Sequence, residues 1–250
     1  MKKFLGILVL GIGIVLSIPK SVQAVGTCNV TVDGSYGFPN KIHYCTDNNV
    51  MEISVKMERN WALADLNTNT ANNVSITITA TGSMLSNKSG AATITGNGTD
   101  GATIINAGTV RAGINTINFN TGTNVTITNQ SGGVIKAEHA TLDERNTAIK
   151  ANGTGFTLNN SGDITATGIN TILTGENSTI INNSGGTIQG DRYGINGTGT
   201  NSGTSSTITN SGNIYGTTNR AIYINGSNYT ITNQSGGLIR AGSDGSTNTS

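Results

Sequence analysis

Few residues in this 250-residue chain are candidates for a pair of catalytic acids or for a nucleophile and its base. Cleavage of a glycosidic bond requires two carboxyl groups that converge on one sugar. The acids considered for such a pair are Asp143, Glu144, Asp163 and Asp191. His43 and His139 are isolated, so neither indicates a nucleophile and its base. The sequence therefore predicts no catalytic residue, no cofactor and no enzymatic activity, with a polysaccharide lyase or hydrolase as the alternative.

Both cysteines, Cys28 and Cys45, lie near the start of the chain. With His43 they would supply three zinc ligands, but a fourth ligand is missing and the spacing fits no zinc motif. In an exported protein, two nearby cysteines form a disulfide more often than a metal site. We therefore predict no metal site and a Cys28–Cys45 disulfide, which would add about 3 kcal/mol of stability through loop closure.

The segment Gly96–Gly101 matches G-x-G-x-x-G by letter. A dinucleotide site would need this motif between a strand and a helix, and no helical pattern follows it. The segment also resembles one copy of a calcium-binding G-x-G-x-D repeat, which functions in tandem arrays. Because glycine is so frequent in this chain, we interpret the segment as a turn.

A recurring segment predicts the strands that position the candidate residues named above. It runs from Val125 to Ala137 (VTITNQSGGVIKA) and returns nearly unchanged from Tyr229 to Ala241 (YTITNQSGGLIRA). The anchoring threonines of all copies are Thr77, Thr103, Thr126, Thr157, Thr179, Thr207 and Thr230. Their separations range from 22 to 31 residues, and a variable period of this size indicates stacked repeats rather than a globular core.

Each repeat contains three short strands in a constant order. In 126–128 the isoleucine faces the opposite side from the two threonines; a second strand spans 134–137, and a third begins at 148. Strands in this order pair with their equivalents one repeat away. This pairing predicts an all-β fold, a right-handed parallel β-helix of about seven rungs spaced about 4.8 Å apart. The predicted inward core residues are Ile104, Ile127, Leu158, Ile180, Ile208 and Ile231 on the first strand, and Val110, Ile135, Ile164, Ile188, Ile214 and Ile239 on the second.

A column of asparagines ends the first strand of six repeats: Asn106, Asn129, Asn160, Asn182, Asn210 and Asn233. Asparagine tolerates the left-handed conformation that a sharp corner needs, and its amide can hydrogen bond to the amide of the next rung. We predict a structural ladder, with an exposed binding strip as the alternative.

The same alignment separates the candidate acids. Asp163 would lie between Val134 and Thr187 of the neighbouring rungs, so no acidic column is expected. Asp143 and Glu144 fall in the longest insertion, which we expect to be a solvated loop.

Residues 1–24 have the pattern of a secretory signal peptide, with Lys2 and Lys3 followed by an apolar stretch from Phe4 to Ile18. Their removal takes away three of the 14 basic residues and none of the 13 acidic ones, which leaves a net charge of −2. Nucleic acids and anionic membranes both require clustered lysine and arginine. The charge balance therefore argues against either as a partner.

Residues 46–72 match the repeat poorly, and the repeats occupy 73–250. Terminal repeats of a solenoid are atypical because they cover its apolar end, so we predict that 25–72 form an N-terminal cap stapled by the disulfide. Trp61 lies in the densest apolar patch of the predicted cap. The alternative is that Trp61 forms a platform on which a ligand stacks. The last copy is incomplete and would leave Ile231 and Ile239 on an open edge, which predicts end-to-end self-association.

A signal peptide followed by Asn/Thr/Gly-rich rungs of the form T-I-T-N-x-S-G-x-I resembles the passenger domain of bacterial autotransporter adhesins, over about residues 74–250. The resemblance implies secretion, display at the outer membrane of a Gram-negative bacterium, and a role in adhesion or as a structural stalk. It also implies an outer-membrane translocator barrel, encoded beyond Ser250 or supplied in trans. The implied partner is a surface ligand, host or abiotic, such as a glycan or a matrix protein.

Overall fold

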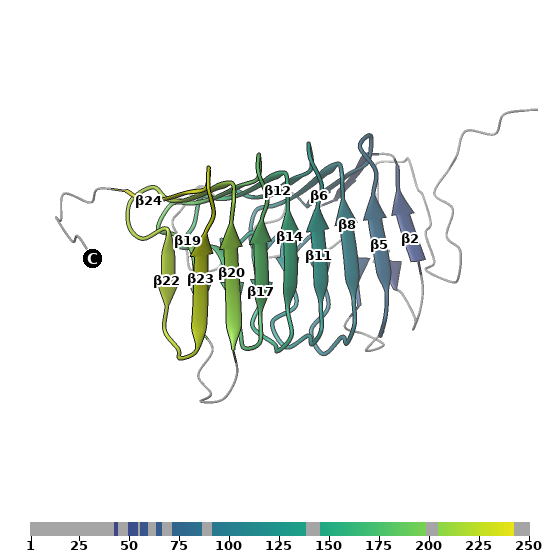
Figure 1. The fold of residues 1–250 in the computed structure, drawn as a ribbon. Helices are drawn as coiled ribbons and strands as arrows, with labels where there is room; N and C mark the ends of the chain where they lie inside the picture. The colour runs from purple at the N-terminus through teal and green to yellow at the C-terminus, as the bar shows by residue number, and fades with distance from the viewer. Residues whose placement is uncertain are drawn as a thin grey trace, which may run out of the picture.

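The computed structural model describes residues 43–44, 50–54, 56–59, 64–66, 72–86, 92–138, 146–198 and 205–242. Every regular element in these ranges is a strand, and the strands form a parallel β-solenoid, as the repeats predict. The successive strands contribute in rotation to three sheets of eight strands each. Figure 1 shows the strands of one sheet standing side by side along the length of the solenoid.

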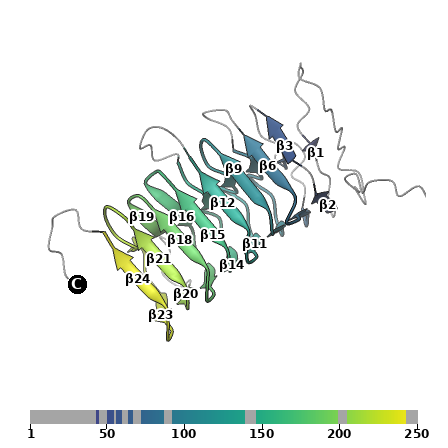
Figure 2. The ribbon, with the colours of Figure 1, turned by 90° about the horizontal axis from the view of Figure 1, so that it is seen from above.

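The three sheets correspond to the three strands of each repeat. The first sheet comprises β2 (Val50–Ile53), β5 (Ser75–Ile78), β8 (Thr103–Asn106), β11 (Thr126–Asn129), β14 (Thr157–Asn160), β17 (Thr179–Asn182), β20 (Ser206–Asn210) and β23 (Tyr229–Asn233). The second sheet, seen from above in Figure 2, comprises β3 (Lys56–Arg59), β6 (Ser83–Ser86), β9 (Thr109–Ala112), β12 (Val134–Ala137), β15 (Asp163–Ala166), β18 (Thr187–Gly190), β21 (Asn213–Gly216) and β24 (Leu238–Ala241). The third sheet comprises β1 (His43–Tyr44), β4 (Ala64–Asp65), β7 (Ile94–Thr95), β10 (Ile117–Asn118), β13 (Ile149–Ala151), β16 (Asn170–Thr174), β19 (Tyr193–Gly197) and β22 (Ile222–Ile224).

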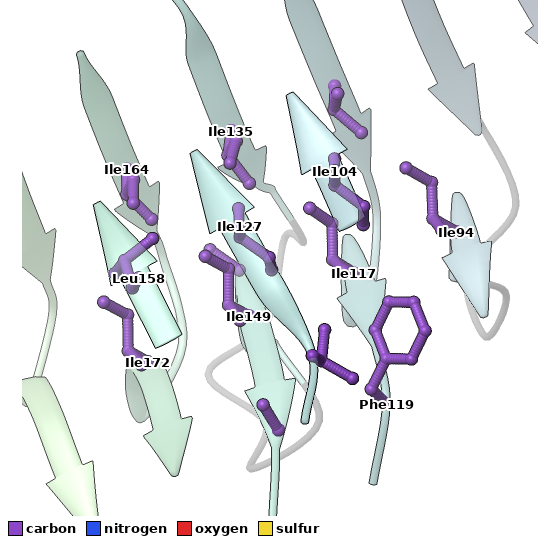
Figure 3. Close-up of a cluster of buried hydrophobic side chains, with 14 of the residues drawn as sticks. Ile94, Ile104, Ile117, Phe119, Ile127, Ile135, Ile149, Leu158, Ile164 and Ile172 are labelled. Atoms are coloured by element: carbon purple, nitrogen blue, oxygen red, sulfur yellow. The ribbon is translucent and has the colours of Figure 1, made fainter. Parts of the chain in front are cut away.

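The core is a set of isoleucine-rich columns that run along the axis. Ile127 pairs in register with Ile104 on one side and with Leu158 on the other. Side chains from the three sheets converge between the sheets, as Figure 3 shows for Ile127, Ile135 and Ile149. The predicted core residues that are at most 1% exposed are Ile104, Ile127, Leu158, Ile180, Ile208, Val110, Ile135, Ile164, Ile188 and Ile214.

The two remaining predicted core residues lie on the last described rung. Ile239 is partly buried and packs against the core, whereas Ile231 is 46% exposed. Each rung therefore needs a neighbour on both sides to bury its apolar residues, and no described rung covers this one.

The solenoid extends into the segment predicted as the cap. Val50–Ile53 pairs in register with Ser75–Ile78, and the two following strands pair with β6 and β7. Met51 and Ile53 are fully buried in the positions that Ile76 and Ile78 occupy one rung later. This rung keeps the inward-facing apolar residues, but it lacks the threonine, asparagine and glycine residues of the repeat motif. Comparison with the motif therefore missed it.

The register also corrects the alignment of the first copy. Ser75, not Thr77, pairs with Thr103, and Thr77 pairs with Ile105. The prediction matched the letters T-I-T of 77–79, which lie two residues later. Because a shift of two residues keeps every side chain on its face of the strand, the inward and outward assignments survive the error.

Candidate functional site

The six predicted ladder asparagines form one column on the inner side of the first sheet. The Nδ2 atoms of Asn106, Asn129, Asn160, Asn182 and Asn210 each donate to the Oδ1 of the asparagine one rung further, at 2.8, 2.9, 2.8, 2.8 and 2.8 Å. These five donors have no exposed surface, and Asn233 on the last described rung is exposed. Ile53 and Ile78 occupy the same column before the ladder begins.

The ladder amides also bond to the backbone at the corner that follows. Asn160 Nδ2 donates to the carbonyl oxygen of Thr187 at 3.2 Å, and Asn160 Oδ1 accepts from the Gly162 N–H at 3.3 Å. Burial of a polar group is tolerated when it is hydrogen bonded in this way. Because the buried amides already form hydrogen bonds inside the solenoid, this column does not present a binding strip to a ligand.

A glycine follows each ladder position at the corner, at Gly108, Gly133, Gly162, Gly186, Gly212 and Gly237. A Cβ on Gly162 would lie 2.2 Å from the Gly133 carbonyl oxygen and 2.8 Å from Asn129 Nδ2. No side chain fits where successive corners and the ladder amides approach this closely. Close approach thus explains the glycines at these positions. The glycines of the Ser-Gly pairs in the longer corners, Gly132, Gly185 and Gly236, instead have φ values of 80°, 83° and 84° and open space around a Cβ.

The conformational reason given for the ladder asparagines was wrong. None of them has a positive φ; the left-handed asparagines are Asn73, Asn115, Asn124, Asn177 and Asn228, at φ values of 54°, 34°, 51°, 51° and 62°. Four of these, all except Asn115, lie at the corner that enters the first sheet, where Gly101 and Gly155 take the same conformation in other rungs. The ladder asparagines are the last residues of extended strands, and in the corner that follows them the left-handed residues are glycines, Gly132, Gly185 and Gly236.

The outer face of the first sheet carries two columns of side chains in register. One consists of Ser75, Thr103, Thr126, Thr157, Thr179, Thr207 and Thr230, and the other of Thr77, Ile105, Thr128, Asn159, Ile181, Thr209 and Thr232. All are at least partly exposed. We call this face, defined by these two columns, the threonine wall. It offers hydroxyl groups repeated at the spacing of the rungs, about 4.8 Å.

The candidate acids are dispersed. Asp163 is exposed and lies between Val134 and Thr187, as the alignment predicts. Asp191 follows β18, and its Oδ1 accepts a hydrogen bond from Thr217 Oγ1 at 3.0 Å. The two carboxylates occupy different positions along the rung. Asp143, Glu144 and His139 lie outside the described residues, and of His43 only the backbone is described.

Charge on the middle of the second sheet is partly neutralised, because two cations share one carboxylate. Arg111 and Lys136 are neighbours in register, and both form ion pairs with Glu138. All three side chains are partly exposed. A surface arrangement of this kind contributes little net stability, but it offsets the repulsion between the two cations.

Asp100 lies at the corner that enters the first sheet. Its Oδ1 accepts hydrogen bonds from Thr123 Oγ1 at 2.7 Å and from Asn124 Nδ2 at 2.8 Å. These bonds, the Thr123 bond foremost, lower the pKa of the Asp100 carboxyl from its ordinary value. Because the folded-state pKa is lowered, the stabilisation is fully present above the unfolded pKa of about 3.9 and is lost as the pH falls through the folded pKa.

Substitution of Thr123 by valine is expected to raise the pKa of the Asp100 carboxyl, because the hydroxyl that stabilises the ionised form is removed. A carboxyl-detected NMR titration measures this directly. Thr128→Val, on the threonine wall away from Asp100, serves as the control and should leave the titration unchanged. An unaltered Asp100 midpoint in Thr123→Val would contradict the hydrogen-bond assignment.

The Gly96–Gly101 segment is a turn, as predicted, with Gly98 and Gly101 at φ values of 77° and 71°. In the described ranges no three histidine, cysteine or acidic side chains come together as metal ligands would. The residues of the predicted disulfide, Cys28 and Cys45, and Trp61 of the predicted cap lie outside the described part of the chain, as do residues 1–24.

Sequence reasoning missed a cluster of aromatic and cationic side chains near the end of the described chain. The rings of Tyr193 and Tyr223 stack with their centroids 5.1 Å apart and an interplanar angle of 21°. The Cζ of Arg192 lies 5.4 Å from the Tyr193 centroid, and that of Arg220 lies 5.1 Å from the Tyr223 centroid. The signal was present in the composition, because four of the six tyrosines lie between positions 193 and 229.

The register, the three parallel sheets and the buried amide ladder define this chain as a parallel β-solenoid protein. No protein-family model matches the chain, and neither a curated protein nor a solved structure matches it. The described residues form no helix that is long and apolar enough to span a bilayer. The functional argument therefore depends on the surfaces of the solenoid itself.

Proposed function

We propose that the chain is an exported, non-enzymatic surface protein that acts in adhesion or as a structural stalk. The observation that carries the proposal is the threonine wall, which presents in-register hydroxyl and amide groups along the length of the first sheet. Solenoids use extended faces of this kind to bind large or repetitive partners. Many weak contacts along one rigid face add up to strong attachment when they engage together.

The location and route of export belong to the same proposal. The pattern of residues 1–24 supports secretion, and the likeness to autotransporter passenger domains supports display at the outer membrane of a Gram-negative bacterium. A translocator barrel, encoded beyond Ser250 or supplied in trans, would carry the chain across that membrane. The proposed ligand is a component of a host or abiotic surface.

The proposal predicts that display of the chain on a non-adherent bacterium increases attachment to cells or to abiotic surfaces. Two substitutions on the wall, Thr157→Glu and Thr179→Glu on adjacent rungs, should abolish most of the increase because they place charge in the middle of the contact face. Attachment is counted after washing at equal levels of displayed protein.

The matched control places the same two charges on another face. Ser83 and Thr109 are also outward neighbours on adjacent rungs, but they belong to the second sheet. Ser83→Glu with Thr109→Glu should leave attachment intact. Failure of the displayed chain to increase attachment at all would refute the adhesion function, and equal loss in both variants would refute the assignment to the threonine wall.

A further inference from the structure

The cluster around Tyr193 and Tyr223 is built at one corner of two neighbouring rungs. Arg192 and Tyr193 follow β18, and Arg220 and Tyr223 follow β21, which pairs with β18. The carbonyl oxygens of Arg192 and Arg220 both approach Gly216, since a Cβ there would lie 2.5 and 2.1 Å from them. Arg192 and Arg220 therefore lie at the same corner on successive rungs, and the guanidinium group of each lies beside a tyrosine ring.

The carboxylates in the described part of the chain do not form ion pairs with the arginines of this corner. Among residues 187–242 the only acid is Asp191, against three arginines. Asp191 accepts its hydrogen bonds from Thr217 and Thr218, and neither Arg192 nor Arg220 forms an ion pair with a described carboxylate. Arg111 and Lys136, by contrast, share Glu138.

Packing against the rings pre-orients the guanidinium groups. A guanidinium held over a ring keeps the N–H edges in its plane free for a bidentate bond to a carboxylate or a sulfate. Its rotameric freedom is already restricted, so less entropy is lost when a ligand binds. Arg192 and both rings are partly exposed, and Arg220 is exposed.

A second surface adjoins the same corner. An open hollow on the second sheet is lined by Gln189, Tyr215, Gly216, Thr217, Arg240 and Ala241. Gln189, Tyr215 and Arg240 are neighbours in register on β18, β21 and β24, which lie side by side near the yellow end of the chain in Figure 2. This hollow shares Gly216 with the arginine corner and adds a third cation and a third tyrosine.

We propose that this corner binds an acidic polysaccharide, with Arg192 and Arg220 pairing with carboxylate or sulfate groups on successive sugars. The proposal rests on the proposed adhesion function and names its ligand class. Tyr215 in the adjoining hollow adds an apolar ring with a polar tip, which suits the mixed character of a sugar ring. A nucleic acid fits less well, because its backbone carries charge at about every 1.7 Å and binding depends on many phosphate contacts.

The test measures binding of the full-length chain to immobilised polygalacturonate and to dextran sulfate, with neutral dextran and single-stranded DNA as comparison polymers. The variant carries Arg192→Gln and Arg220→Gln. We expect it to lose affinity for the acidic polymers roughly 10- to 100-fold, since each charge-assisted contact is worth about a factor of ten. Binding of the unmodified chain should also weaken with added salt.

The matched control is Arg111→Gln with Lys136→Gln, which removes the same formal charge from a site already paired with Glu138. It should keep the affinity of the unmodified chain. Circular dichroism and melting temperature establish that both variants fold. Stronger binding to polygalacturonate or to dextran sulfate identifies which anionic group the corner prefers, and either result supports the proposal.

Equal loss in the two variants, equal binding of neutral dextran, or tighter binding of DNA would each overturn the proposal. The outcome is separable from that of the adhesion test. A displayed chain that adheres through the threonine wall but does not bind the acidic polymers refutes only the corner site. A chain that binds the polymers but does not increase attachment refutes only the adhesion function.

Discussion

Replacement of Ile127 by aspartate is expected to lower the free energy of unfolding by several kcal/mol. Ile127 has no exposed surface and is stacked between Ile104 and Leu158. A carboxylate at this position would lie in the isoleucine-rich core, between the side chains of Ile104 and Leu158. Chemical denaturation followed by circular dichroism measures the loss, and failure to fold at all is its extreme form.

The neighbouring residue provides the control. Thr128 is on the same strand but faces outward on the threonine wall, between Ile105 and Asn159. Thr128→Asp should change the free energy of unfolding by about 1 kcal/mol or less, because the charge stays in water. Similar losses from the two substitutions would show that the inward and outward faces of this strand are assigned wrongly.

The second large effect is expected for Asn160→Ala in the buried ladder. The substitution removes the acceptor of Asn129 and the donor to Asn182, together with the bonds to Thr187 and Gly162. A buried polar atom left without a partner costs about 1–3 kcal/mol, so we expect a total loss of about 3 kcal/mol. Thermal or denaturant unfolding of the purified chain gives this value.

Asn159→Ala is the matched control, since it removes the same side chain from the adjacent, outward position. It should cost less than about 0.5 kcal/mol. If alanine at 159 is as harmful as alanine at 160, the stability of this strand does not depend on the ladder. A neutral effect at both positions would lead to the same conclusion.

The fold could be predicted from the sequence because its information is periodic. Isoleucine and threonine alternate within each strand, and the strands recur in a constant order, so the three sheets and their register follow from repetition. The buried position of the ladder was also available, because Asn129 is two residues beyond Ile127 and must face the same side. The left-handed conformation was assigned to the wrong asparagines because asparagine is common both in the ladder and at the left-handed position before the first strand, at Asn73, Asn124, Asn177 and Asn228.

The arginine and tyrosine cluster could not be predicted in the same way. Arg192 and Arg220 are 28 residues apart and occupy a corner, where the chain has no alternation to reveal its direction. Only the register of β18 with β21 brings them together. The strand at Val50–Ile53 was not recognised as part of a rung for the opposite reason, because it keeps the alternating burial of the solenoid without the residue types of the repeat.

The hydrogen bonds between rungs run along the axis of the solenoid, because neighbouring strands in every sheet belong to successive rungs. Tension applied between the two ends of the chain therefore pulls on the bonds of one terminal rung at a time, rather than shearing all of them together. A rung of about 25 residues would lengthen the chain by roughly 80–90 Å when it peels away. An anchored molecule of this kind would yield under load in a series of similar steps, and each remaining rung would keep its own structure while the last one opened.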